Sequence, residues 1–305
     1  MITTPNMKSS LIIGTRGSAL ALWQANAVAA MLRARYADLE IALEIIETKG
    51  DRVLDSSLEA IGDKGLFTKE LEVALLERRI DCAVHSLKDM QTELPEGLTL
   101  GAVPERADPR DALVAPEGMT IARLREGAVV ATGSIRRRAQ LLSLRPDLEV
   151  VDVRGNVPTR VRKYHENGWD GMILAAAGLK RLDMEGEIAA LIPPEAMVPA
   201  AGQGALAIEM RGDDEEVFNL LLPLDHAPTR YAVEAERAFL ARLDGGCRTP
   251  IGAHATVDGD RLELVGLLAD RDGDHVVRGT IDGTTDEAEA LGRRLAEQIE
   301  RESMA

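Results

Sequence analysis

Three consecutive arginines, Arg136 to Arg138, follow the sequence Thr132-Gly133-Ser134, which is typical of a strand end and a helix cap. Between Gly133 and His165 the chain carries eight lysines or arginines and three acidic residues, although its net charge is −15. Cations in the first turn of a helix oppose the helix dipole and cost about 0.3–1 kcal/mol each. The cluster therefore indicates a compensating negative group, and the chemistry that it suggests is anion binding.

A second basic cluster repeats this arrangement. Residues 149–153 have the pattern of a strand, Arg154-Gly155-Asn156 that of a turn, and Pro158 suits the start of a helix that carries Arg160. In successive βα units both clusters would lie at the carboxyl edge of one parallel sheet, where open α/β domains bind ligands. A solvated basic face is the alternative. Nucleic acid is less favoured, because aromatic residues are only 3% of a net negative chain.

One of the two cysteines lies in a sequence that suits chemistry. Cys247 follows Gly245-Gly246, which allow positive φ angles, and precedes Arg248, which would favour the thiolate. A nucleophile or a covalent attachment point is therefore credible, and the lack of an evident histidine partner favours attachment. Cys82 lies inside an apolar strand pattern and is expected to be an inert core residue.

Two further motifs follow predicted strands. Gly14-Thr-Arg-Gly-Ser18 offers backbone N–H groups, a hydroxyl and Arg16 to an anion, although a plain glycine turn is an alternative. His85-Ser-Leu-Lys-Asp89 places opposite charges side by side, which is compatible with a surface ion pair. If Asp89 is buried, it could instead stabilise a cationic intermediate or move a proton.

Composition limits the class of protein. A chain of 305 residues with 45% hydrophobic residues can form two or three domains with ample core. Its apolar stretches are shorter than a membrane span, and its first ten residues lack the apolar segment of a signal peptide. With only two cysteines, the protein is expected in the cytoplasm. The five histidines show no metal-ligand spacing, so no metal site is predicted.

Predicted strands and helices alternate over the first two thirds of the chain. Helices are expected over residues 19–36 and 68–79, and two proline-rich connectors, 104–110 and 193–202, flank the arginine-rich block. This pattern indicates one α/β domain inserted in another. After a helix over 229–243, alternating segments predict a small antiparallel sheet and a closing helix.

The chain resembles the porphobilinogen deaminase family, also called the hydroxymethylbilane synthases, in an ordered set of motifs. These motifs are Gly14-Thr-Arg-Gly-Ser-Ala-Leu-Ala21, Asp63-Lys-Gly-Leu-Phe-Thr-Lys-Glu-Leu71, Val84-His-Ser-Leu-Lys-Asp89, Ser134-Ile-Arg-Arg137, Arg154-Gly-Asn156, Ala177-Gly-Leu-Lys-Arg-Leu182, Gly202-Gln-Gly204 and Gly245-Gly-Cys247. The resemblance is close over residues 11–252 and looser beyond.

The resemblance implies a fold and a reaction. The fold would be α/β, with two periplasmic-binding-protein-like domains, the second inserted in the first, and a C-terminal α+β domain with an antiparallel sheet. The corresponding ranges are 1–103 with 199–223, 104–198, and 224–305. The enzyme would be a monomeric transferase that joins four porphobilinogen molecules into hydroxymethylbilane with loss of ammonia, without a metal. A dipyrromethane cofactor, linked by a thioether to Cys247, would prime the chain.

Site residues carry over from the resemblance position by position. Asp89 corresponds to the catalytic carboxylate. The positions that correspond to cofactor binding are Cys247, Ser18, Lys88, Asp89, Ser134, Arg136, Arg137, Arg154 and Gly155. Those that correspond to substrate binding are Arg16, Ser18, Lys64, Arg154, Arg160, Arg181 and Gln203.

The chain departs from the family pattern at a few positions, Ala60, Gln91, Gly133 and Asp244, where lysine, proline, serine and glutamate are common. The alternative function is a non-enzymatic sensor of a small anion with a periplasmic-binding-protein-like fold, which would give the cysteine loop no role.

Overall fold

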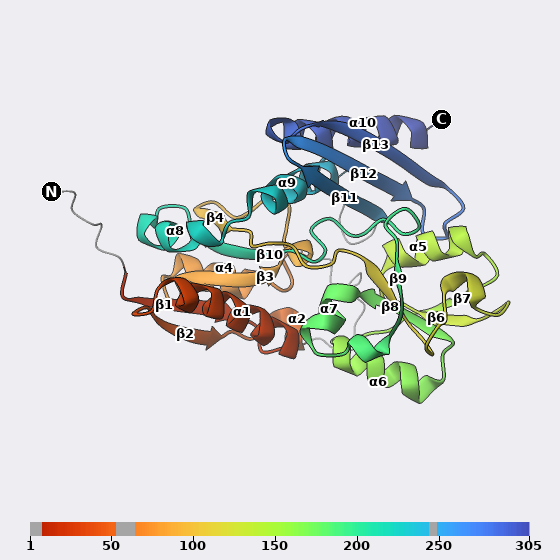
Figure 1. Cartoon of the computed structure of the whole chain (residues 1–305), viewed down its shortest axis with the longest axis horizontal. Helices are drawn as coiled ribbons and strands as arrows, with labels where there is room; N and C mark the ends of the chain where they lie inside the picture. The colour runs from red at the N-terminus through yellow and green to blue at the C-terminus, as the bar shows by residue number, and fades with distance from the viewer. Residues whose placement is uncertain (1–7, 53–64, 244–248, 305) are drawn as a thin grey trace. The chain divides into compact units, whose positions relative to one another are not determined.

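The computed structural model describes residues 8–52, 65–243 and 249–304 (Figure 1). These residues form two compact units. The first unit comprises residues 8–52, 65–106 and 205–230, and the second comprises 107–204 and 231–304. Each unit is described by itself below.

The first unit is built on a five-stranded sheet. Its order is β2 (Glu40–Ile45), β1 (Ser10–Thr15), β3 (Cys82–Ser86), β10 (Leu206–Arg211) and β4 (Leu98–Ala102). The strands β2, β1 and β3 are parallel, and β10 runs antiparallel to both of its neighbours. The chain leaves this sheet after β4 and returns to it only at β10.

Helices cover both faces of this sheet. Helices α1 (Ala19–Arg35) and α8 (Glu215–Leu221) pack on the face that carries Leu11 and Val84, and α4 (Lys69–Leu76) packs on the face of Ala83. A short helix, α2 (Lys49–Arg52), and the 3-10 turns η1 (Leu87–Asp89) and η4 (Leu222–Leu224) complete the unit. Ala83 and Val84 pack on opposite faces because successive side chains along a strand point to opposite sides of the sheet.

Helix α4 is shorter than the sequence predicted. The expected helix ran over residues 68–79, but it ends at Leu76 because Arg78 adopts a φ of 59°. The N–H of Arg79 then donates to the carbonyl of Ala74, which closes the helix in the manner of a Schellman motif. A non-glycine residue in the left-handed region is uncommon, so this helix end was not predictable from the residue type of Arg78.

The second unit contains a sheet with the same pattern of strand directions. Its order is β7 (Glu149–Val151), β6 (Val129–Ala131), β8 (Gly171–Ala175), β5 (Asp111–Val114) and β9 (Ile188–Ile192). The strands β7, β6 and β8 are parallel, and β5 is antiparallel to β8 and β9. Helices α6 (Val157–Asn167) and α7 (Ala176–Arg181) cover one face, and α5 (Ile135–Leu144) covers the other. The 3-10 turns η2 (Ile121–Arg123) and η3 (Glu185–Glu187) lie in its connections.

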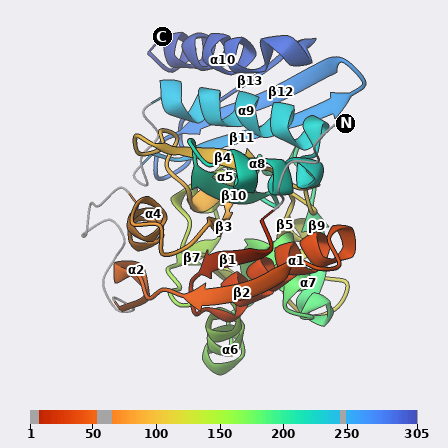
Figure 2. The ribbon, with the colours of Figure 1, turned by 90° about the vertical axis from the view of Figure 1, so that its left-hand side faces the viewer.

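The second unit also contains the C-terminal antiparallel sheet. It is formed by β11 (Ile251–Asp258), β12 (Arg261–Ala269) and β13 (Val276–Thr284). Helices α9 (Ala227–Arg242) and α10 (Ala288–Ser303), the latter preceded by the turn η5 (Thr285–Glu287), pack on one face of it, where Phe239 and Leu295 both contact Gly266. Figure 2 shows the two helices extending in nearly the same direction. The predicted α/β class with a small C-terminal antiparallel sheet is confirmed.

Gly292 provides a test of this helix packing. A methyl group at this position would lie 2.3 Å from the backbone oxygen of Ala235 in α9. Helix propensity alone favours Gly292→Ala by about 1 kcal/mol, but forced overpacking costs about 1–3 kcal/mol. We therefore expect Gly292→Ala to lower the free energy of unfolding in urea. Gly186→Ala is the matched control, because a methyl group there meets open space, and that variant should be neutral or slightly stabilised.

Candidate functional site

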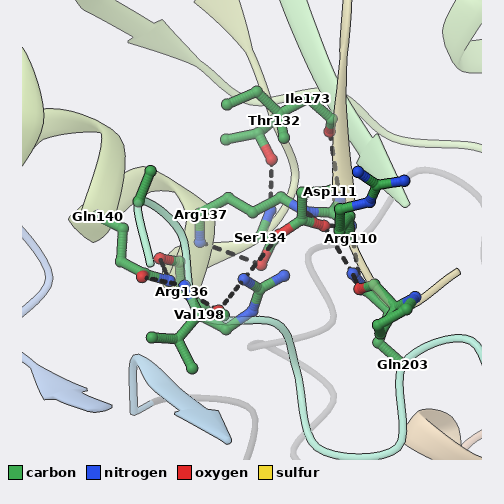
Figure 3. A network of polar contacts seen from close by, with 12 residues as sticks. Arg110, Asp111, Thr132, Ser134, Arg136, Arg137, Gln140, Ile173, Val198 and Gln203 are labelled. Carbon is green, nitrogen blue, oxygen red and sulfur yellow. Dashed lines mark hydrogen bonds and ion pairs between the residues drawn. The ribbon is translucent and has the colours of Figure 1, made fainter. Parts of the chain in front are cut away.

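The arginines that follow β6 surround a buried carboxylate. Ser134 caps α5, and its Oγ accepts from the N–H of Arg137 at 3.4 Å. This cap places Arg136 and Arg137 in the first turn of the helix. Arg136 Nη1 donates to Asp111 Oδ2 at 2.8 Å, and Arg137 Nε donates to Asp111 Oδ1 at 2.9 Å. Figure 3 shows both guanidinium groups converging on Asp111, which is 0% exposed.

Gln203 completes this cluster. Its Nε2 donates to Asp111 Oδ1 at 2.8 Å and to the carbonyl of Pro109 at 2.7 Å, while its Oε1 accepts from Arg137 Nη2 at 3.4 Å. Arg137 Nη1 also donates to the carbonyl of Ile173 in β8. The cluster thus joins β5, α5, β8 and the segment that contains Gln203.

The charges of the cluster do not cancel. Burial raises the pKa of Asp111, but the two guanidinium groups outweigh that effect and hold this pKa well below its usual range. Burial lowers the pKa of Arg136; Asp111 opposes this shift, whereas the like charge of Arg137 adds to it. Two buried cations therefore share one carboxylate, and the excess positive charge favours a second anion. Asp111 supplies part of the negative charge that the sequence pattern implied.

Sequence reasoning missed Asp111. It follows the connector 104–110 and is separated from Arg136 by 25 positions, so no local pattern links the two residues. The available signal was an acidic residue directly before the apolar run Ala112-Leu113-Val114, since a carboxylate at the start of a buried strand needs a cation.

The second predicted cluster lies at the same sheet edge, because β6 and β7 are parallel neighbours and the N–H of Thr132 donates to the carbonyl of Val151. Arg154 Nε donates to Asp152 Oδ2 at 2.7 Å, and Arg160 Nε donates to the carbonyl of Gly155 at 2.6 Å. Gly155 has a φ of +118°, which suits glycine. Arg154 and Arg160 thus both donate hydrogen bonds to residues of this turn or directly before it.

Gly133 has a steric reason to depart from the family pattern. A Cβ atom at this position would lie 2.5 Å from the backbone oxygen of Val153, at the point where the two turns meet. The glycine therefore permits the close approach of the turns that carry Ser134 and Arg154.

Arg181 is also buried. It ends α7, and its Nη2 donates to the carbonyl of Gly204 at 2.7 Å. Burial lowers the pKa of Arg181 to about 10. Within the second unit, Arg181 therefore holds the backbone next to Gln203.

In the first unit, Arg16 lies beside a carboxylate and an aromatic ring. Its Nε donates to both carboxylate oxygens of Asp51 at 3.2 Å, and its guanidinium carbon lies 4.2 Å from the centroid of the Phe67 ring. Burial raises the pKa of Asp51, but hydrogen bonds from Arg16 and Thr48 outweigh it and lower that pKa. Sequence reasoning missed Asp51 and Phe67, which are distant from Arg16 along the chain.

The turn that carries Asp89 lies next to the turn that carries Ser18, because β1 and β3 are parallel neighbours. Ser18 caps α1, and its Oγ accepts from the N–H of Ala21 at 3.3 Å. Ser86 Oγ accepts from Gln24 Nε2 of α1 at 2.7 Å. Lys88 and Asp89 are both exposed, so the condition of a buried Asp89 is not met.

Four predicted or variant positions, Lys64, Cys247, Ala60 and Asp244, lie outside the described residues. Cys82 is buried, and burial raises the pKa of its thiol far above the usual range, as expected for an inert core cysteine. Residues 8–52, 65–243 and 249–304 contain no group of three or more histidine, cysteine or acidic side chains that could hold a metal ion. None of the helices in these ranges has the length and apolar character needed to cross a membrane.

The buried cluster predicts a specific dependence of stability on pH. Asp111→Asn keeps the shape of the side chain but leaves two buried guanidinium groups without a countercharge. We expect a loss of about 3–5 kcal/mol in the free energy of unfolding, measured in urea at pH 7. Because the pKa of Asp111 is lowered on folding, its contribution is present above the unfolded-state pKa of about 3.9 and is lost as the pH falls below it.

The difference between the wild type and Asp111→Asn should therefore shrink below about pH 4. Asp147→Asn is the matched control in the same unit, because Asp147 is exposed and pairs with Arg145 at the surface. It should change stability little. Equal unfolding free energies for Asp111→Asn and the wild type at pH 7 would contradict the electrostatic role of the cluster.

The chain matches two family models. Residues 11–219 match the dipyrromethane cofactor-binding domain of porphobilinogen deaminase, and residues 230–301 match the C-terminal domain of porphobilinogen deaminase. Among curated proteins, the porphobilinogen deaminase of Roseiflexus sp. is 53% identical over 96% of both chains. That of Carboxydothermus hydrogenoformans is 48% identical over 96% of this chain and 94% of its own.

Among solved structures, the methionine-binding protein MetQ is 11% identical, with a TM-score of 0.43 over 70% of this chain and 89% of its own. The effector-binding domain of BenM with benzoate is 14% identical, with a TM-score of 0.41 over 71% of this chain and 92% of its own. The two family models together span most of the chain, and the curated relatives are about half identical to it. This chain therefore belongs to the porphobilinogen deaminase family.

Proposed function

We propose that this protein is a porphobilinogen deaminase that joins four porphobilinogen molecules head to tail, with loss of ammonia, and that addition of water then releases hydroxymethylbilane. The observation that carries the proposal is the buried cluster in which Arg136 and Arg137 share the single carboxylate of Asp111. Porphobilinogen and its oligomers bear acetate and propionate groups. A site with an excess of buried positive charge suits such ligands.

The described residues fit a dipyrromethane cofactor, for which we propose thioether attachment at Cys247. Among those residues, no hydrogen bond occupies Nε or Nη2 of Arg136, so this guanidinium retains donors for a carboxylate. When bound, the cofactor supplies the pyrrole carbon to which the first substrate unit is added. The other residues that we propose for binding of the cofactor are Ser18, Lys88, Asp89, Ser134, Arg136, Arg137, Arg154 and Gly155.

For the substrate we propose a wider set of cationic and polar residues: Arg16, Ser18, Lys64, Arg154, Arg160, Arg181 and Gln203. The contacts within the chain divide their roles. Arg16 is held by Asp51 and Phe67, which fixes the direction of its guanidinium group. Gln203 and Arg181 are 1% and 8% exposed and bond mainly to neighbouring groups of the chain, so we assign them to holding the arginine cluster in place.

Asp89 is the proposed catalytic carboxylate. Loss of ammonia from porphobilinogen leaves a cationic centre on the substrate, and a nearby negative charge lowers the free energy of that state. The exposure of Asp89, at the end of the turn that follows β3, leaves its carboxylate accessible to a ligand. A side chain in that position can also accept a proton from a pyrrole nitrogen.

We further propose a cytoplasmic monomer of three domains with no nucleic-acid partner, divided at 1–103 with 199–223, 104–198 and 224–305. The supporting features are the separate five-stranded sheets, the distinct C-terminal antiparallel sheet and the net charge of −15. An anion sensor would use the arginines equally well. The match of residues 11–219 to a cofactor-binding domain favours the enzyme.

Intact mass tests the attachment of the cofactor. Wild-type protein from a host that makes porphobilinogen should carry the added mass of a dipyrromethane group. Cys247→Ser should lack it and lose activity, because a hydroxyl is a far weaker nucleophile than a thiolate. Cys82→Ser is the control and should keep both the added mass and the activity, since Cys82 is buried in β3. An unmodified wild-type chain would instead support the sensor.

Measurement of kcat tests the proposed catalytic role of the Asp89 carboxylate. Asp89→Asn removes one charge with little change in volume, so we expect kcat to fall by about 10²-fold or more with an unchanged free energy of unfolding. Asp213→Asn is the control in the same unit, because Asp213 forms an exposed pair with Arg78, and that variant should retain the wild-type kcat. A near-normal kcat for Asp89→Asn would remove Asp89 from the mechanism.

A further inference from the structure

Gln140 lies behind the arginine cluster and is 0% exposed. It belongs to α5, one turn after Arg136. Its Oε1 accepts from the N–H of Val198 at 2.7 Å, and its Nε2 donates to the carbonyl of Val198 at 3.1 Å. The side-chain amide therefore satisfies both backbone polar groups of Val198, as a neighbouring strand would.

The carbonyl of Val198 is also a partner of Arg136. Arg136 Nη1 donates to it at 2.6 Å and to Asp111 at 2.8 Å. Gln140 Nε2 additionally donates to the backbone carbonyl of Arg136 at 3.4 Å. Figure 3 shows Gln140, Val198 and Arg136 side by side. Gln140 thus fixes one of the two acceptors that orient the Arg136 guanidinium.

Arg278 of β13 reaches the same place from the C-terminal sheet. Its Nη2 donates to Gln140 Oε1 at 3.2 Å and to the carbonyl of Ala196 at 3.1 Å, and its Nη1 donates to the carbonyl of Glu195 at 2.6 Å. One side chain therefore ties the C-terminal sheet both to Gln140 and to the segment that leads into Val198.

The surrounding packing leaves little room for this segment to move. The N–H of Ala253 in β11 donates to the carbonyl of Pro199 at 2.9 Å. A Cβ atom on Gly252, five residues after Cys247 in the sequence, would lie 2.9 Å from the oxygen of Val198. Val198 also packs with Ala139 of α5 and Leu267 of β12. Residues 252 and 253, which follow Cys247 in the sequence, therefore adjoin the segment whose Val198 carbonyl Arg136 binds.

We propose that Gln140 and Arg278 are positioning residues for the cofactor. They hold the carbonyl of Val198 in a fixed position relative to the C-terminal sheet, whose first strand follows Cys247 in the sequence. Through this carbonyl they also orient the Arg136 guanidinium. Neither residue touches the cofactor. The inference rests on the proposed function, because it assigns to Arg136 a carboxylate of a group attached at Cys247.

The experiment follows covalent attachment to cofactor-free protein. The protein is produced in a host that makes no porphobilinogen, porphobilinogen is then added, and the gain in intact mass is followed with time. Gln140→Leu has a similar size and removes all of the hydrogen bonds of the amide. We expect it to slow attachment about 10- to 100-fold, because small errors in position carry penalties of that order.

Variants at Arg278, which is exposed, test the same positioning role from the C-terminal sheet. Arg278→Met should slow attachment in the same direction, and Arg278→Lys should restore much of the rate, because an ammonium group can still donate to the carbonyls of the segment. Should Gln140→Leu fail to fold, this pair still decides the question, since Arg278 is exposed.

A purely structural role predicts a different outcome. Leu141→Ala is the matched control, because Leu141 is the next residue of α5, is 0% exposed and packs in a separate core cluster. It should lose stability but attach the cofactor at nearly the wild-type rate. Wild-type rates for Gln140→Leu and Arg278→Met, or equal slowing by Leu141→Ala, would overturn the positioning role. Failure of the wild type itself to gain mass would refute the proposed function instead.

Discussion

The pairing of one buried carboxylate with two guanidinium groups constrains the part of the second unit that carries the candidate site. Asp111, Arg136 and Arg137 come from the first residue of β5 and the first turn of α5, and their remaining bonds reach β8 and the segment at 198–203. Burying an ion is costly unless it is paired and hydrogen-bonded. Each partner is therefore constrained by the others, and the cluster links four segments that are far apart in the sequence: β5, α5, β8 and residues 198–203.

Strand direction explains why the carboxylate lies there. Asp111 begins an antiparallel strand and pairs with Ala175, the last residue of β8. The start of an antiparallel strand lies at the carboxyl edge of its parallel neighbours, which is also where the helix that follows β6 begins. An acidic residue at that strand start can therefore meet the first turn of α5. The first unit repeats the geometry, because Leu206 at the start of β10 pairs with Ser86 at the end of β3.

Local signals in the sequence predicted the local parts of the site. Ser134 was recognisable as a helix cap that follows a strand, and it caps α5 after β6. The strand predicted over 149–153 begins at Glu149 as expected but ends at Val151. Asp111 and Asp51 were not predictable in the same way, because each binds an arginine 25 or 35 positions away, and such a pairing depends on tertiary contacts. The end of α4 was mispredicted for a different reason, a left-handed conformation at Arg78 that its residue type does not favour.

The internal carboxylates also bear on ligand binding. An arginine cluster without Asp111 would carry two buried unpaired charges and would destabilise the folded state, whereas one with two carboxylates would be neutral and would offer little to an anion. A single carboxylate keeps the guanidinium groups ordered and leaves a net positive charge. Arg16 is held in a comparable way by Asp51. Because these cations are oriented before a ligand arrives, a bound carboxylate bears less of the entropy cost of ordering them.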